Sequence, residues 1–209
     1  MGASQARQQG IGMSKYYPDQ TTYPSKNVGI DIRSLGEEGR RSHELKKEFS
    51  GHVKATLTGN VLKLTAQKVE DGNVDSVALP KGPAVYHTHP RQCPNLKNCS
   101  LIPPSAEDMK IFASRKNTQA VMSRDFIYIL RLRSQYQHIG YTEIQAIFDF
   151  FQVFEQHFDE LTKGSHDDYE DIWNNAVIWS NWFDIIRFDN EKCLHSFRTY
   201  QLYTVLPKQ

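Results

Sequence analysis

Residues 52–65 read HVKATLTGNVLKLT, and this stretch decides how the chain is expected to fold. Apolar and polar side chains alternate before and after Gly59-Asn60, with the period of two that is typical of a half-buried strand. A two-residue connection with glycine in its first position is typical of a type II′ turn. The stretch therefore predicts an antiparallel β-hairpin.

Further elements are expected on both sides of this hairpin. Pro80-Lys81-Gly82-Pro83 predicts a turn, and the Pro- and Asn-rich segment 90–104 predicts a loop. The expected elements are a short charged helix at 37–48, strands at 74–79 and 84–88, a helix at 105–116, and a second hairpin formed by 120–123 and 126–132.

The C-terminal third of the sequence is rich in aromatic residues. Thr142 with Gln145 has the pattern of a capping box, and apolar residues then recur at helical spacing as far as Leu161. A second helix is expected from about 168 to 187, and residues 197–206 alternate enough to predict a strand. We expect the aromatic side chains mainly in the core, although helices with this many of them could also dock a partner.

Together these elements predict an α+β fold of α/β/α-like layering, with a mixed, mainly antiparallel sheet and flanking helices. We divide the chain into an extended N-terminal arm at 1–36, a core at 37–136, and a C-terminal helical extension with a terminal strand at 137–209. The arm is rich in Gln, Ser, Gly, Tyr and Pro and lacks apolar periodicity, so it is not expected to fold alone.

The composition narrows the class of protein. Hydrophobic residues make up 39% of the 209, enough for a domain with its own core. The net charge is +1, so neither nucleic acid nor a membrane surface is expected as the main partner. The first residues lack the apolar segment of a secretory signal, and the cysteine count is odd, so we expect a reducing, cytoplasmic location.

Two histidines and an aspartate have the spacing of a metal site. His87 and His89 stand two residues apart at the end of an expected strand, so their side chains point to the same face. Asp108 lies near the start of the next expected helix, where it can supply an oxygen ligand. Two imidazoles, one carboxylate and an open position for water favour Zn²⁺.

Glu48 and Ser105 are candidates for catalysis beside this site. A carboxylate that is not itself a ligand can transfer protons, and Glu48 precedes Gly51 at an expected helix-to-strand junction. Ser105 stands three residues before Asp108. Each pattern also has a structural explanation, because Ser-x-x-Asp is a common helix capping box and Glu48 could be an acid at a helix end.

The Glu-x-x-Gly, His-x-His and Ser-x-x-Asp patterns, in this order, resemble the JAMM motif of the JAB1/MPN/Mov34 metalloprotease family. The resemblance covers roughly residues 37–132 and implies an MPN-type fold. It also implies the roles of the site residues: His87, His89 and Asp108 would bind Zn²⁺, Glu48 would exchange protons with the attacking water and the leaving amine, and Ser105 would donate a hydrogen bond to the oxyanion.

The segment between His89 and Ser105 departs from the family's pattern, because the loop at 90–104 is longer than the family usually has. Such a loop could reshape or block the substrate groove. It carries Cys93 and Cys99, which could bind a second metal ion, form a disulfide or remain reduced.

Two functions are compatible with this sequence. The first is a zinc-dependent (iso)peptidase that hydrolyses a peptide or isopeptide bond of a protein substrate, in the manner of the deubiquitinating members of the family. The second is a JAMM-like scaffold in a large assembly, such as a minor capsid protein in the virion of a large DNA virus. In that case the N-terminal arm and the C-terminal helices would contact the assembly partners.

Overall fold

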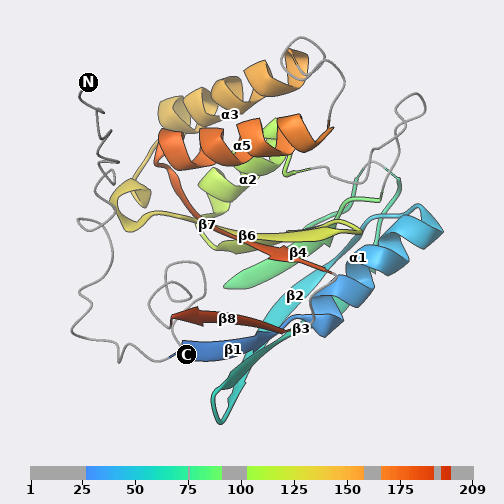
Figure 1. Ribbon diagram of the computed structural model, residues 1–209. Helices are drawn as coiled ribbons and strands as arrows, with labels where there is room; N and C mark the ends of the chain where they lie inside the picture. Colours follow the sequence, from blue (N-terminus) through green and yellow to red (C-terminus); the bar gives the residue numbers. More distant parts are fainter. Residues whose placement is uncertain (1–26, 75, 91–102, 158–165, 191–193, 199–209) are drawn as a thin grey trace, which may run out of the picture.

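The computed structural model describes residues 27–74, 76–90, 103–157, 166–190 and 194–198. Within them, one sheet of eight strands separates two layers of helices (Figure 1). The arrangement confirms the predicted α+β class and the mixed, mainly antiparallel sheet.

The strands of the sheet come from both ends of the described chain. Their order across the sheet is β7-β6-β5-β4-β2-β3-β1-β8. Neighbouring strands run parallel at β4–β5 and β1–β3 and antiparallel elsewhere. The strands are β1 (Asn27–Asp31), β2 (Phe49–Thr58), β3 (Val61–Asp71), β4 (Ala84–Thr88), β5 (Thr118–Met122), β6 (Phe126–Leu132), β7 (Phe183–Asp189) and β8 (Leu194–Arg198).

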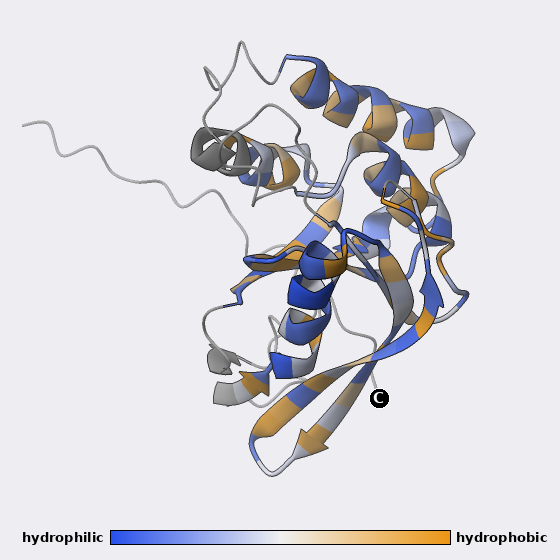
Figure 2. Ribbon diagram, turned by 90° about the vertical axis from the view of Figure 1, so that its right-hand side faces the viewer, coloured by the Kyte–Doolittle hydropathy of each residue, from blue (hydrophilic) through white to orange (hydrophobic). Residues whose placement is uncertain are grey.

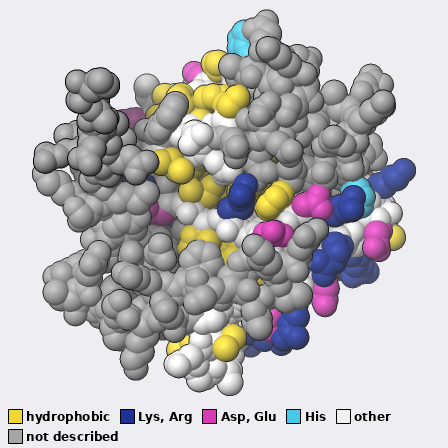
Figure 3. Space-filling model, viewed as in Figure 1, with side chains coloured by type: hydrophobic (Ala, Val, Ile, Leu, Met, Phe, Trp, Pro, Cys, Tyr) yellow, Lys and Arg dark blue, Asp and Glu magenta, His cyan; other side chains and the backbone are white. Residues whose placement is uncertain are grey.

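One helix covers one face of the sheet, and the other helices cover the opposite face (Figure 1). The helices are α1 (Arg33–Leu45), α2 (Ala106–Arg115), α3 (Tyr141–Gln156) and α5 (His166–Ser180), with a 3-10 turn at Ser134–Tyr136. The outer side of α1 is hydrophilic (Figure 2), and acidic and basic side chains are interspersed on this side of the molecule (Figure 3). None of the helices in the described ranges is both long and apolar enough to cross a membrane.

Strand β6 shows how an alternating sequence builds a core on each face of the sheet. Ile127 and Ile129 belong to the core beneath α1, which includes Leu35 of that helix. Tyr128 and Leu130 point the other way and join the core formed with α2, α3 and α5. Burying side chains of this size stabilises a fold by about 1.5–3 kcal/mol each. The two cores therefore fix the central strands from both sides.

The hairpin predicted from residues 52–65 is present. Strands β2 and β3 pair antiparallel up to Thr58 and Val61, which flank the turn. Gly59 has a φ of 59°, whereas Asn60 is not among the described residues with positive φ. This is the pattern of the predicted type II′ turn. The structure also confirms the helix predicted at 105–116, as α2, and the second predicted hairpin, as β5 and β6.

One predicted strand is absent, and one predicted helix ends earlier than expected. The described residues of 74–79 form no strand. The helix predicted from 168 to 187 ends at Ser180, because Asn181 adopts a left-handed conformation with a φ of 60° and the strand β7 begins two residues later. The branched apolar pair Ile185-Ile186 suits this strand as well as it suits a helix.

The cap of α3 also differs from the prediction. The helix begins at Tyr141, and the carboxylate of Glu143 accepts a hydrogen bond from the backbone N–H of Gly140 at 3.1 Å. Glu143 therefore has the role in capping the start of α3 that was predicted for Gln145. In both cases the capping side chain stands three residues after the residue that it caps, so the spacing alone did not distinguish Gly140 with Glu143 from Thr142 with Gln145.

The ends of the described chain take part in the sheet. Strand β1 and the first turn of α1 lie within residues 27–36, which we had assigned to the extended arm, and β1 pairs with β3 and β8. Strand β7 pairs with β6, so the C-terminal third contributes strands as well as helices. Residues 1–26 of the predicted arm and residues 199–206 of the predicted tail strand lie outside the described residues.

Helix α1 approaches the sheet closely because it carries a glycine where it crosses the turn between β5 and β6. A Cβ atom at Gly39 would lie 2.2 Å from the carbonyl oxygen of Ser123. Asn190 holds the same turn by donating hydrogen bonds from Nδ2 to the carbonyls of Ser123 and Arg124, each at 2.9 Å. These hydrogen bonds hold the turn at the place where α1 passes it.

We expect Gly39→Ala to lower the free energy of unfolding by about 1–3 kcal/mol, as overpacking does, although alanine favours a helix by about 1 kcal/mol over glycine. Urea unfolding measures the change. Gly36→Ala is the matched control in the same helix, because its Cβ would meet first a side-chain atom, Asn190 Oδ1, at 3.3 Å. An equal loss of stability in both variants would contradict the role given to the contact with Ser123.

Candidate metal centre

Both histidines stand at the end of a buried central strand. Strand β4 pairs with β2 on one side and β5 on the other, and His87 lies opposite Ser50 and Val121. His87 is only 3% exposed. The backbone N–H of His89 donates to the carbonyl of Met122 at 2.9 Å. The sheet therefore fixes the backbone that carries both imidazoles.

Asp108 approaches the histidines from the first turn of α2. Ser105 is the N-cap of this helix, and its hydroxyl accepts a hydrogen bond from the backbone N–H of Asp108 at 3.1 Å. In return, Asp108 Oδ2 accepts from the backbone N–H of Ser105 at 2.8 Å and from its hydroxyl at 2.7 Å. This capping box fixes the carboxylate at the helix end that faces β4.

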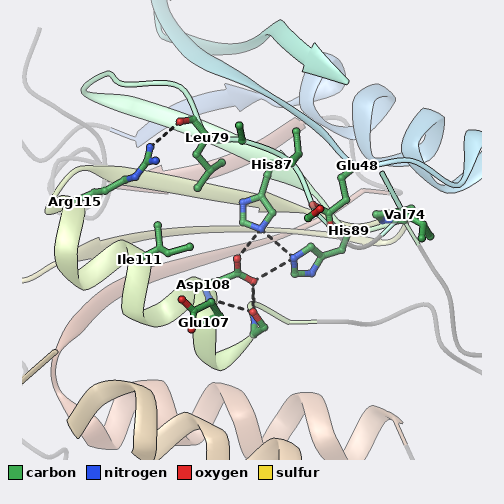
Figure 4. A pocket seen from close by; sticks show the side chains of 14 residues that line it. Glu48, Val74, Leu79, His87, His89, Glu107, Asp108, Ile111 and Arg115 are labelled. Atoms are coloured by element: carbon green, nitrogen blue, oxygen red, sulfur yellow. Dashed lines mark hydrogen bonds and ion pairs between the residues drawn. The ribbon is translucent and has the colours of Figure 1, made fainter. Parts of the chain in front are cut away.

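The three candidate ligands converge on one point (Figure 4). The Nε2 atoms of His87 and His89 are 3.0 Å apart. Asp108 places Oδ1 3.0 Å from Nε2 of His87 and Oδ2 3.3 Å from Nε2 of His89. Two ligand atoms bound to one tetrahedral zinc ion lie about 3.3–3.4 Å apart, given bonds of about 2.0–2.1 Å. The observed separations are close to this value, so the group could hold a metal ion.

The electrostatics of the group also suit a cation. Burial alone raises the pKa of the Asp108 carboxyl, but the imidazoles of His87 and His89 outweigh it and hold that pKa well below its usual range. A neutral imidazole has only one N–H, so two facing Nε2 atoms leave room for one proton between them. The two Nε2 atoms and the carboxylate oxygens face one another at 3.0–3.3 Å, an arrangement that a divalent ion between them would stabilise. An ionised carboxylate with two neutral imidazoles is a ligand set that zinc accepts.

Glu48 reaches the same place from the residue that precedes β2. It is 8% exposed. Its backbone N–H donates to the carbonyl of Asn73, and its carbonyl accepts from the N–H of Gly72, both at 2.8 Å. Its carboxylate points toward the two histidines (Figure 4). Glu48 is thus a buried acid beside the cluster and not an exposed acid at a helix end.

The glycine of the Glu-x-x-Gly pattern has a structural reason of its own. A bulge interrupts the pairing of β2 with β3 between Ser50 and Gly51. A Cβ atom at Gly51 would lie 2.1 Å from the carbonyl oxygen of Gln67 and 2.7 Å from Cε1 of Tyr86. Only glycine fits this position, which sets the path of the backbone just after Glu48.

One cavity of about 570 Å³ is lined by the five residues that match the JAMM-like pattern, Glu48, His87, His89, Ser105 and Asp108. Apolar side chains of Val77, Leu79 and Ile111 also line it. Arg115 of α2 joins two segments of the wall, because its Nη1 donates to the carbonyls of Leu79 and Pro80 at 3.1 and 2.8 Å. The stretch at 74–79 that was predicted as a strand therefore forms part of the lining.

The sequence patterns did not reveal Glu155. This residue lies in the last turn of α3, and its Oε1 accepts a hydrogen bond from the backbone N–H of Ala106 at 2.6 Å. Burial raises the pKa of the Glu155 carboxyl. The available signal was one acid in a helix rich in phenylalanine, and it gives no indication of a partner 49 residues away in the chain.

The predicted roles of Cys93 and Cys99 stay predictions, because residues 91–102 lie outside the described part of the chain. The same applies to the effect of the long loop on the substrate groove.

No protein-family model matches this chain, and no curated protein matches it in sequence. The interpretation of the site therefore depends on the geometry and chemistry of its own residues.

We expect the purified chain, dialysed against Zn²⁺ and then against buffer, to retain about one ion per chain, as a three-ligand site does. Loss of a hydrogen bond that orients a metal ligand weakens metal binding by roughly 10–100-fold. Asp108→Ala and His89→Ala remove a ligand itself, so they should weaken zinc binding by more than this. Elemental analysis and chelator competition measure this. Glu107→Ala is the matched control, because this neighbouring acid is exposed and pairs with Lys110. Binding that is unchanged in Asp108→Ala would contradict the assignment of the ligands.

Proposed function

We propose that this protein is a zinc-dependent hydrolase of the JAMM type that cleaves a peptide or isopeptide bond in a protein substrate. One observation carries the proposal: residues from separate segments, Glu48, His87, His89, Ser105 and Asp108, line one cavity, with the candidate ligand atoms at the spacing that an ion requires. The order of the elements, with a helix, a hairpin, the His-x-His strand, the Ser-x-x-Asp helix and two further strands, supports an MPN-type fold.

His87, His89 and Asp108 would hold the ion, and their donor set favours zinc among the common divalent metals. A bound zinc ion supplies Lewis-acid chemistry, because it polarises a carbonyl group and makes water more acidic. The chain itself orients these ligands through the pairing of β4 and through the capping box of α2. The site is thus built from rigid elements, as precise catalytic geometry requires.

Glu48 would act as the general base and then as the general acid. It takes a proton from the attacking water and gives it to the nitrogen of the leaving amine. Its burial suits this work, because a carboxylate removed from bulk water interacts more strongly with a nearby proton donor. It lines the same cavity as the candidate ligands without belonging to the group that could hold the ion, which is the placement that a proton-transferring carboxylate requires.

Ser105 would stabilise the oxyanion of the tetrahedral intermediate. Its hydroxyl now donates to Asp108 Oδ2, so it has to turn toward the substrate to take this role. The carboxylate does not lose its support when the hydroxyl turns, because the backbone N–H of Ser105 donates to the same oxygen at 2.8 Å. The capping box and the oxyanion role are therefore compatible.

The cavity offers both apolar and polar contacts to the substrate chain next to the cleaved bond. Val77, Leu79 and Ile111 offer apolar contacts, whereas the carboxylates and imidazoles lie together around the candidate metal position. We propose the C-terminal tail of ubiquitin or of a ubiquitin-like protein as this substrate chain, which makes isopeptide-linked conjugates the first ones to test.

We expect Glu48→Gln to keep the metal and to lower the rate of hydrolysis of a ubiquitin-type isopeptide by about 10²–10⁴-fold, the usual contribution of a general acid–base group. The variant keeps the size of the side chain and removes only its ability to carry a proton. Rates on the zinc-loaded protein and its metal content are measured together. Glu44→Gln, at the exposed end of α1, is the control.

Hydrolysis that continues at the wild-type rate in Glu48→Gln would contradict the role of Glu48. A zinc-loaded wild type that cleaves neither isopeptide nor peptide substrates would contradict the proposed reaction.

A further inference from the structure

The N-terminal end of α2 is held from outside by a residue of α3. The first N–H groups of a helix have no partner within the helix and need an external acceptor. At the start of α2, Ser105 supplies acceptors for Asp108 and Met109, through its hydroxyl and its carbonyl. The N–H of Ala106 donates instead to Glu155 Oε1, at 2.6 Å. A charged acceptor makes this hydrogen bond stronger than one between neutral groups.

Glu155 is therefore connected to the candidate metal centre through the backbone of α2. Ala106 stands between Ser105, which caps the helix, and Asp108, whose carboxylate faces both histidines. The Ala106 side chain is buried, so its hydrogen bond fixes a segment that is already packed. Small shifts of this first turn would move Asp108 Oδ1 and Oδ2 away from the Nε2 atoms of the imidazoles.

We propose that Glu155 is a positioning residue of the metal centre, which sets the placement of Asp108 by holding the first turn of α2. This inference rests on the metal-binding part of the proposed function, and it does not depend on the reaction or the substrate. Glu155 acts by its hydrogen bond and not as a ligand, because it is not part of the described group that could hold an ion.

The chemistry of the side chain allows the hydrogen bond to be separated from the charge. Glutamine at position 155 keeps the length and an oxygen acceptor but removes the charge. Aspartate keeps the charge but is one methylene shorter, so its oxygens no longer reach the N–H of Ala106 at hydrogen-bond distance. A role in positioning predicts that Gln works better than Asp, whereas a role through the electric field predicts the reverse.

The test measures zinc affinity by chelator competition and the visible absorption spectrum of the Co²⁺ form, for the full chain and its variants. We expect Glu155→Ala and Glu155→Asp to bind zinc about 10–100-fold more weakly, the usual cost of losing a group that orients a ligand, and to show an altered Co²⁺ spectrum. Glu155→Gln should remain within about threefold of the wild type, since it keeps the acceptor. Asp149→Ala is the matched control, because this exposed acid of α3 only accepts from Gln145 among the described hydrogen bonds.

Each outcome decides for or against the positioning role. Zinc affinity and a Co²⁺ spectrum equal to the wild type in Glu155→Ala and Glu155→Asp would overturn it, even if thermal unfolding showed a loss of stability. Better binding by Asp than by Gln would also overturn it and would assign the effect to charge. If Glu155→Ala does not fold, the comparison of Gln with Asp still decides. A wild type that binds zinc but hydrolyses nothing would contradict the proposed reaction and leave this test unaffected.

Discussion

The carboxylate of Asp108 meets two structural demands at once, and the site depends on this coincidence. It completes the capping box of α2 by accepting from the N–H and the hydroxyl of Ser105, and it faces the imidazoles of His87 and His89. A side chain that closes a helix has little rotational freedom left. The helix cap therefore pre-organises the one carboxylate that the candidate metal centre needs.

The position of β4 in the sheet supplies the other half of that geometry. The strand is buried along its whole length and is paired on both edges, antiparallel to β2 and parallel to β5. Its last residues also receive support from the side, since the hydroxyl of Thr88 accepts from the N–H of Phe49 at 2.7 Å. This contact joins the strand that carries the histidines to the segment that carries Glu48. Parts of the site that are far apart in sequence are thus linked by hydrogen bonds that involve the backbone.

Local patterns in the sequence predicted those parts of the molecule that local physics decides. The turn at Gly59 requires a positive φ, so a few residues were enough to predict the hairpin. The Ser-x-x-Asp spacing is that of a capping box at a helix N-terminus, so a few residues were also enough to predict α2. Long-range contacts decided what was missed. Residues 183–189 form an edge strand because β6 offers them a partner, and Glu155 finds its hydrogen bond on another helix. Neither partner is visible in a sequence window.

The burial of several polar groups in one place indicates that this part of the fold serves a function. Glu48, His87 and Asp108 are largely withdrawn from water within one cavity, and withdrawal of charged groups from water costs several kcal/mol for each ion before any compensation. Apolar residues in these positions would give a more stable end to β4 and α2. A chain that keeps two acids and two imidazoles there gives up stability, and clusters of this kind are found at sites that bind or react. A divalent ion would offset this cost, because the candidate ligand atoms of His87, His89 and Asp108 already lie at the spacing that an ion requires.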